Sequence, residues 1–221
     1  MTAIEDLIEP LRHSPLLPQI VERLCHQIAA ERQRRSTFYA EMTPDQKVEF
    51  IDGEIVLHSP ARNRHLDVTL RIAKLLDTFT KLYGIGEVKV EKCLCVFPRN
   101  DYEPDVVFFT AEKVATFTSE TLQFPVPDLI VEVLSDSTEH RDRGVKFEDF
   151  AANNVAEYWI VDADESVIEQ FCLNGEQYQL MIKASTGPLK SSVIHGFEVD
   201  IEAFFDDAKN LAALRKLLIG G

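Results

Sequence analysis

The stretch Pro127-Asp-Leu-Ile-Val-Glu-Val-Leu134 decides the fold class, because it is a nearly continuous apolar run with one carboxylate inside it. Such a run is typical of a strand that is covered on both faces. Two further runs, Asp105-Val-Val-Phe-Phe109 and Glu157-Tyr-Trp-Ile-Val-Asp162, have the same character, and Pro104 leads into the first of them. These runs predict buried strands at the centre of the protein.

Helical patterns lie between these runs. Leu66, Leu70 and Ala73 recur at helical spacing, and the pattern stops at Gly84, which predicts a helix from about 62 to 82. Further helices are predicted over about 143–153 and 206–218, and further strands over 86–97, 166–173 and 177–183. The sequence therefore predicts a mixed α/β (α+β) fold with a central mixed β-sheet flanked by helices.

The N-terminal part has a different pattern. Apolar residues recur at helical spacing from Ile4 to about Arg35, with prolines between them. The Asp52-Gly53 dipeptide lies between two short β-rich runs in residues 47–58, which predicts a tight hairpin. We predict a helical N-terminal extension over residues 1–46 and one domain over residues 47–221. The apolar stripe of the extension needs a partner surface, so we expect a homodimer.

Composition limits the class of protein. The chain has 221 residues, of which 45% are hydrophobic, enough to bury a full core. It has no apolar run near the roughly 18 residues of a membrane span and no signal-peptide pattern at Met1, so we expect a cytoplasmic protein without a membrane partner. The formal net charge of −14 opposes unspecific binding to a phosphate backbone, although Arg32, Arg34 and Arg35 form either a basic surface or a solvated helix end.

The chemistry centres on two carboxylates. Glu132 lies inside a buried strand, where a carboxylate without a partner would cost several kcal/mol. Asp105 lies at the mouth of another buried strand. Two such carboxylates on neighbouring strands are suited to a hard cation, Mg²⁺ or Mn²⁺, so we predict that Asp105 and Glu132 are metal ligands.

Lys146 is the third element of this site. It follows Asp142 by one helical turn and shares a helix face with Phe150. If that face packs on the sheet, the ammonium can point at Glu132 and hold an attacking water. The alternative is an exposed helix lysine.

The ordered set Pro104-Asp105, Asp128-Leu-Ile-Val-Glu132-Val-Leu-Ser135, Asp142-x-x-x-Lys146 and Glu157-Tyr-Trp-Ile-Val-Asp162 resembles the Uma-two family. This group of small bacterial proteins is classed with restriction endonucleases in the PD-(D/E)xK nuclease superfamily. The resemblance spans roughly Phe50 to Leu173 and implies a restriction-endonuclease-like core.

The resemblance also implies roles for single residues. Asp105 corresponds to the acidic residue of the PD half-motif, and Glu132 to the first residue of the (D/E)xK half-motif. Leu134 stands where that pattern has lysine, and Lys146 on the next helix is the natural substitute. Glu54 is either a further active-site carboxylate or a solvated turn residue, and His65 either an active-site base or supporting group or an ordinary helix histidine.

The leading hypothesis is a Mg²⁺-dependent endonuclease that hydrolyses DNA phosphodiester bonds, with Asp105, Glu132, Lys146, Glu54 and His65 in its catalytic site. The strongly acidic balance and the lysine missing at position 134 leave two alternatives. One is a catalytically inactive binding or assembly module on the nuclease scaffold. The other is a metal-dependent hydrolase of a small phosphoester.

Overall fold

The computed structural model describes residues 3–43 and 46–219. The chain divides into two compact units, residues 1–58 and residues 59–221. Among the described residues, no helix combines the length and the apolar character that crossing a membrane requires.

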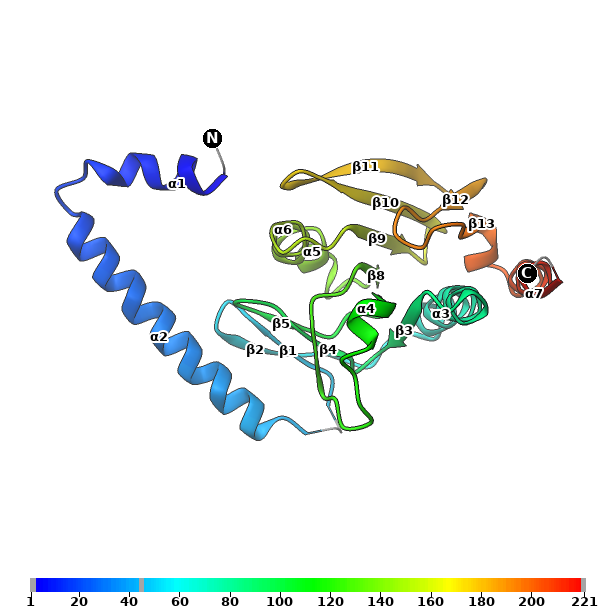
Figure 1. Cartoon of the computed structure of the whole chain (residues 1–221), viewed down its shortest axis with the longest axis horizontal. Helices are drawn as coiled ribbons and strands as arrows, with labels where there is room; N and C mark the ends of the chain where they lie inside the picture. The colour runs from blue at the N-terminus through cyan, green and yellow to red at the C-terminus, as the bar shows by residue number, and fades with distance from the viewer. Residues whose placement is uncertain (1–2, 44–45, 220–221) are drawn as a thin grey trace. The chain divides into compact units, whose positions relative to one another are not determined.

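The described residues of the first unit form two helices and a hairpin: α1 (Ala3–Arg12), α2 (Leu17–Glu41), β1 (Val48–Ile51) and β2 (Glu54–Leu57) (Figure 1). The predicted hairpin turn is confirmed, since Asp52 and Gly53 have φ angles of 50° and 84°. The hairpin is tied to α2 by Arg34, whose Nε donates to the carbonyl of Gly53 at 2.7 Å. The hairpin therefore belongs to the same unit as the helices. The division into an extension over residues 1–46 and a domain over residues 47–221 remains a prediction.

The second unit is built on a six-stranded sheet with the order β11-β10-β9-β8-β6-β3. The strands β8 and β9 run parallel and the other neighbours antiparallel, which confirms the predicted mixed sheet. The six strands are β3 (Gly86–Val90), β6 (Val106–Thr110), β8 (Leu129–Val133), β9 (Glu157–Asp162), β10 (Val167–Asn174) and β11 (Gln177–Ala184).

Helices cover both faces of this sheet, with α3 and α7 on one side and α5 and α6 on the other (Figure 1). These helices are α3 (Asn63–Tyr83), α5 (Glu139–Asp142), α6 (Val145–Ala152) and α7 (Asp207–Ile219). The remaining elements are α4 (Ala111–Val114), η1 (Ile201–Phe204), β4 (Leu94–Val96), β5 (Asp101–Tyr102), β7 (Gln123–Phe124), β12 (Pro188–Lys190) and β13 (Glu198–Asp200).

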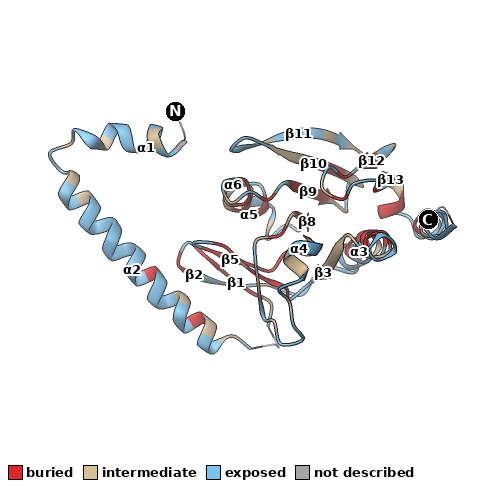
Figure 2. Cartoon of the chain, in the orientation of Figure 1, coloured by how far each residue is buried: buried red, intermediate tan, exposed pale blue. Residues whose placement is uncertain are grey.

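The strand β8 has a buried side chain at every position, as the continuous apolar run predicts (Figure 2). Leu129, Val131 and Val133 pack in the core that α3 closes. Because side chains alternate along a strand, Ile130 and Glu132 point to the opposite face, toward α6. The sheet thus directs the one acidic side chain of β8 into the layer between β8 and α6.

One predicted strand is wrong in its extent. Residues 86–97 form two strands, β3 and β4, because Lys92 between them adopts a φ of 63° and turns the chain. The predicted end of α3 is confirmed, since Gly84 caps the helix with a φ of 63°.

Candidate active site

Three carboxylates lie in register across neighbouring strands. Val106, the first residue of β6, pairs with the last residue of β3 and with the third residue of β8. Extending both registers by one residue places Asp105 between Glu91 and Glu132. Directly opposite residues of antiparallel strands share a face, so the three side chains form a row at one end of the sheet.

Asp105 is held from two sides. Its Oδ2 accepts the backbone N–H of Val133 at 2.9 Å, which links the start of β6 to the end of β8. Its Oδ1 lies 3.3 Å from Nε2 of His65, which α3 contributes from its first turn. The carboxylate is therefore fixed beside an imidazole, and it is 3% exposed.

Lys146 on α6 is buried and points at Glu132. Its Nζ lies 2.8 Å from Oε1 of Glu132 and 3.3 Å from Oδ1 of Asp142, and the residue is 2% exposed. The ammonium also lies 5.8 Å from the centroid of the Tyr102 ring, within range of a cation–π contact. This geometry excludes the alternative of an exposed helix lysine.

The segment that carries Lys146 is anchored to the sheet. Tyr158 on β9 donates its hydroxyl to the backbone carbonyl of Asp142 at 3.1 Å. Burial raises the pKa of Tyr158 well above its ordinary value of 10.0, and the nearby carboxylates of Asp142 and Glu132 raise it further. The phenol therefore keeps its proton and remains a donor.

Arg143 supplies a second anchor between α5 and α6. Its two terminal nitrogens donate to the two carboxylate oxygens of Glu169 on β10, at 2.8 and 3.0 Å. This bidentate pair lowers the pKa of Glu169 and raises the pKa of Arg143. Two contacts to the sheet thus place the start of α6, and with it the Lys146 side chain.

The site has the ligand types and charge that suit a divalent cation. Oxygen and nitrogen atoms of His65, Glu91 and Asp105 lie within 4.8 Å of one another. Glu132, next in the row, is buried with Asp105 and Asp142, so this set combines three buried carboxylates with the ammonium of Lys146. Carboxylate oxygens are the ligands that Mg²⁺ and Mn²⁺ prefer, and a cation here would offset the excess negative charge.

Glu54 and Asp128, which the sequence also singles out, differ from these residues in their surroundings. Glu54 begins β2 in the first unit and is exposed. The two carboxylate oxygens of Asp128 accept hydrogen bonds at 2.8 Å from Nζ of Lys113 and from the backbone N–H of Thr110. It is the polar start of a strand. Glu91 was missed, because it follows β3 as an exposed residue and only the register reveals its neighbours.

Comparison with known proteins agrees with this architecture. Residues 35–202 match the family model Uma2, described as "Putative restriction endonuclease". The chain belongs to the Uma2 family. This finding confirms the resemblance to the Uma-two family that the sequence motifs indicate.

Two similar proteins extend the comparison. The chain is 29% identical over 163 residues to the uncharacterized protein slr1290 of Synechocystis sp., a match that covers 71% of this chain and 83% of the relative. The crystal structure of a "putative nuclease belonging to DUF820" from Anabaena variabilis matches with a TM-score of 0.66 at 15% identity and covers 80% of this chain and 96% of that chain. The match to the Anabaena variabilis structure shows that this Uma2 protein has the same fold.

Proposed function

We propose that this Uma2 protein is a metal-dependent endonuclease that hydrolyses phosphodiester bonds of DNA. One observation carries the proposal: Nζ of Lys146 lies 2.8 Å from the Glu132 carboxylate. The helix α6 thus supplies an ammonium group in place of the motif lysine, whose position Leu134 occupies. The family description supports nuclease chemistry, and DNA is the substrate that this description suggests.

Each side chain of the row has a role in the proposed mechanism. Asp105 and Glu132 would hold Mg²⁺ or Mn²⁺, with Glu91 and His65 near enough to add ligand atoms or to orient bound water. The bound metal would polarise the scissile phosphate and lower the pKa of a coordinated water. Lys146 would position the attacking water and stabilise the charge that develops on the phosphate.

The contact between Lys146 and Glu132 also bears on the inactive-module alternative. That alternative gains if Lys146 lies far from Glu132 or pairs with a remote acid. The contacts of Lys146, 2.8 Å to Glu132 and 3.3 Å to Asp142, instead place the ammonium within the carboxylate cluster. The geometry therefore favours the catalytic hypothesis.

Cleavage assays with purified protein test the proposal. We expect nicking of supercoiled and linear DNA in Mg²⁺ or Mn²⁺, and a loss of at least about a hundredfold in rate for Glu132→Ala and Lys146→Met. Glu148→Gln changes an exposed charge on the same helix and serves as the control for Lys146→Met. Circular dichroism of each variant separates loss of chemistry from loss of fold.

Metal binding is measured independently of cleavage. Calorimetric titration with Mn²⁺ should detect a site in the wild type that Asp105→Asn weakens. Absence of metal binding together with intact single-stranded and double-stranded DNA after incubation would refute the proposal. Hydrolysis of a small diester, bis(p-nitrophenyl) phosphate, with no DNA cleavage would instead favour a metal-dependent hydrolase of a small phosphoester.

A further inference from the structure

A groove of about 540 Å³ lies beside α3. Arg62, Arg64 and Arg71 line it from the helix and the residue before it. Ser166, from the turn between β9 and β10, and Phe205, which follows η1, also line it. The lining thus gathers three guanidinium groups and one carboxylate, that of Asp67.

The deepest of the three is Arg71, whose side chain is only 13% exposed. Its Nε donates to Oδ1 of Asp207 at 2.7 Å, and one terminal nitrogen lies 3.5 Å from the carbonyl of Phe205. Asp207 itself is 87% exposed. The largely buried guanidinium of Arg71 thus pairs with a carboxylate, that of Asp207, which is exposed to solvent.

The two outer arginines also pair with surface carboxylates. Arg62 donates to Asp136 at 2.7 Å, and Arg64 pairs with Asp164. All four side chains are more than half exposed, and exposed pairs of this kind contribute little to stability. A phosphate, which accepts two parallel hydrogen bonds from one guanidinium, can displace these aspartates.

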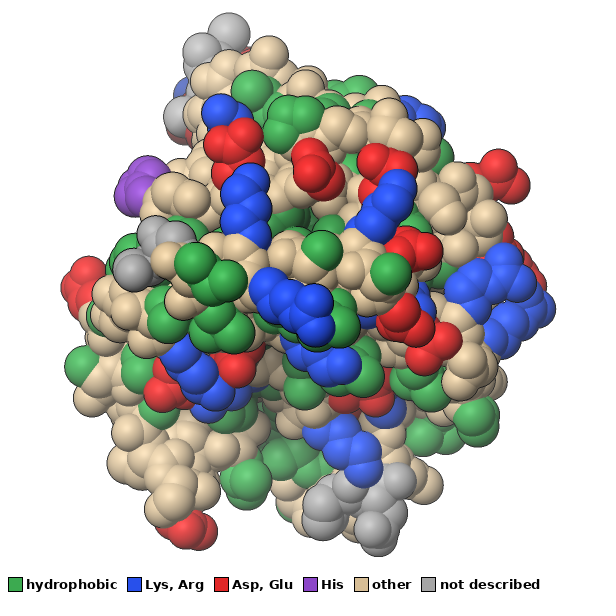
Figure 3. All heavy atoms as spheres, turned by 90° about the vertical axis from the view of Figure 1, so that its right-hand side faces the viewer, with side chains coloured by type: hydrophobic (Ala, Val, Ile, Leu, Met, Phe, Trp, Pro, Cys, Tyr) green, Lys and Arg blue, Asp and Glu red, His purple; other side chains and the backbone are tan. Residues whose placement is uncertain are grey.

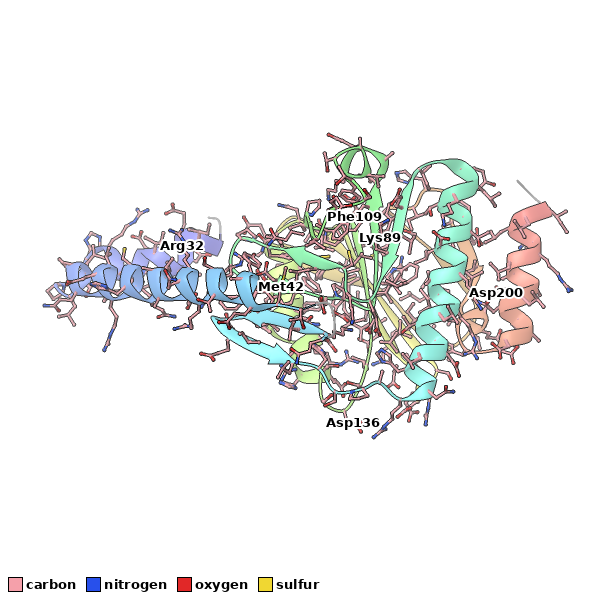
Figure 4. All side chains as sticks on the ribbon, turned by 90° about the horizontal axis from the view of Figure 1, so that it is seen from below. Arg32, Met42, Lys89, Phe109, Asp136 and Asp200 are labelled. Atoms are coloured by element: carbon pink, nitrogen blue, oxygen red, sulfur yellow. The ribbon has the colours of Figure 1, made fainter. Side chains whose placement is uncertain are left out.

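The groove lies along the helix that also carries His65 of the candidate active site. Arg64 and His65 are consecutive residues, and Arg71 follows His65 by six positions, which is roughly 9 Å along a helix axis. A DNA strand carries a phosphate at every nucleotide, so a strand that reaches His65 also has phosphates at the distance of Arg71. Figure 4 shows α3 beside α7, with Asp136 labelled in the loop to which Arg62 reaches.

We propose that this groove binds a backbone phosphate of the DNA strand that the active site cleaves, an inference that rests on the proposed function. Arg71 is the inner contact, and Arg62 and Arg64 are the outer contacts. On the face that carries α3 and α7, basic side chains lie beside acidic ones (Figure 3). The aspartates therefore mask the arginines in the free protein, and the phosphate replaces them on binding.

Paired variants at the outer edge test the inference in both directions. In the full chain, Arg64→Gln should weaken binding of a fluorescent DNA duplex by roughly fivefold and reduce the slope of log affinity against log salt by about 1. Asp164→Asn should tighten binding, because it unmasks Arg64. Arg215→Gln on α7 and Glu165→Gln beside Asp164 are the charge-matched controls, and both residues are exposed.

The outcomes separate this inference from the proposed function. If Arg64→Gln behaves as Arg215→Gln and Asp164→Asn behaves as Glu165→Gln, the arginines only join surface elements and the inference is overturned. The inference is also overturned if inorganic phosphate binding responds to these variants while DNA binding does not. If DNA binding responds as expected but no DNA is cleaved, the groove is a DNA-phosphate site and only the nuclease proposal fails.

Discussion

Glu157, the first residue of β9, is fully buried and anchors a loop through neutral donors. Its carboxylate accepts hydrogen bonds of 2.6–3.0 Å from two side-chain nitrogens, two hydroxyls and two backbone N–H groups, which belong to Trp159, Gln170, Ser191, Ser192 and Val193. Such a set satisfies the carboxylate oxygens of Glu157 in place of water. One side chain therefore fixes residues 191–193 to the central sheet.

We predict that Glu157→Gln destabilises the protein by about 1–3 kcal/mol, because its amide NH₂ would face hydrogen-bond donors. Urea unfolding measures the change in the free energy of unfolding. Glu165→Gln, an exposed substitution in the turn after β9, should stay within about 0.5 kcal/mol of the wild type. Equal unfolding midpoints for the Glu157 variant and the wild type would show that the donors find other acceptors.

Some residues of the candidate site can be predicted from the sequence and others cannot. Glu132 stands out because a carboxylate interrupts an apolar run, and Asp105 because Pro104 leads it into a buried strand. The contact between Lys146 and Glu132 depends on how α6 packs, so the spacing of residues does not determine where the Lys146 side chain points. Glu91 has no local signal, because its place beside Asp105 is a property of the pairing between β3 and β6.

At the scale of elements, the long segments were predictable and the short ones were not. The helix α3 has apolar residues at regular spacing and ends at a glycine, and β8 is a continuous apolar run, so each is encoded locally. The strands β5 and β7 have two residues each, too few to show any periodicity. The pairing of β7 with β4 also joins segments distant in the sequence, which the pattern of a single chain does not encode.

The pairing of β3 with β6 leaves no room for a side chain at Gly86. A Cβ there would lie 2.1 Å from the backbone oxygen of Phe109. We predict that Gly86→Ala lowers the thermal unfolding midpoint far more than Gly84→Ala. At Gly84, whose Cβ would meet nothing within 4 Å, only the left-handed backbone costs about 1 kcal/mol. Similar midpoints for the two variants would mean that β3 can shift away from β6 at little cost.

The Arg143–Glu169 pair makes the anchoring of α6 dependent on pH. The pKa of Glu169 is lowered below its ordinary value of 4.5, first by the hydrogen bond from Arg143 and also by Lys183. Because the pKa of Glu169 is lower in the folded state, the ion pair stabilises the folded protein fully above pH 4.5. This stabilisation is lost as the pH falls through the folded-state pKa. Because Arg143 is partly exposed, the pair contributes only about 1 kcal/mol.

We predict that Arg143→Gln reduces the free energy of unfolding at pH 7 and that its difference from the wild type shrinks as the pH falls below 4.5. Chemical denaturation across this pH range measures the difference. Lys183→Gln, at a more exposed partner of Glu169, should have a smaller effect. A difference that stays constant with pH would assign the effect to lost packing of the Arg143 side chain.

At the scale of the whole molecule, the homodimer stays a prediction, and α2 is its expected interface. Val21, Leu24 and Ile28 recur on this helix and are between 46% and 48% exposed. We predict that the wild type is a dimer by light scattering and that Leu24→Lys shifts it toward the monomer, because a charge enters the apolar stripe. Gln33→Lys adds the same charge at an exposed polar position of α2. A monomeric wild type would contradict the prediction.

The position of Lys146 on α6 has a consequence for heat inactivation. A lysine on β8 would share the rigidity of the central sheet, whereas Lys146 depends on a short helix that Tyr158 and Arg143 hold at its start. Local opening of such a segment requires less free energy than global unfolding. If the proposed mechanism holds, warming should therefore abolish DNA cleavage reversibly at a temperature where the circular dichroism spectrum is still that of the native protein.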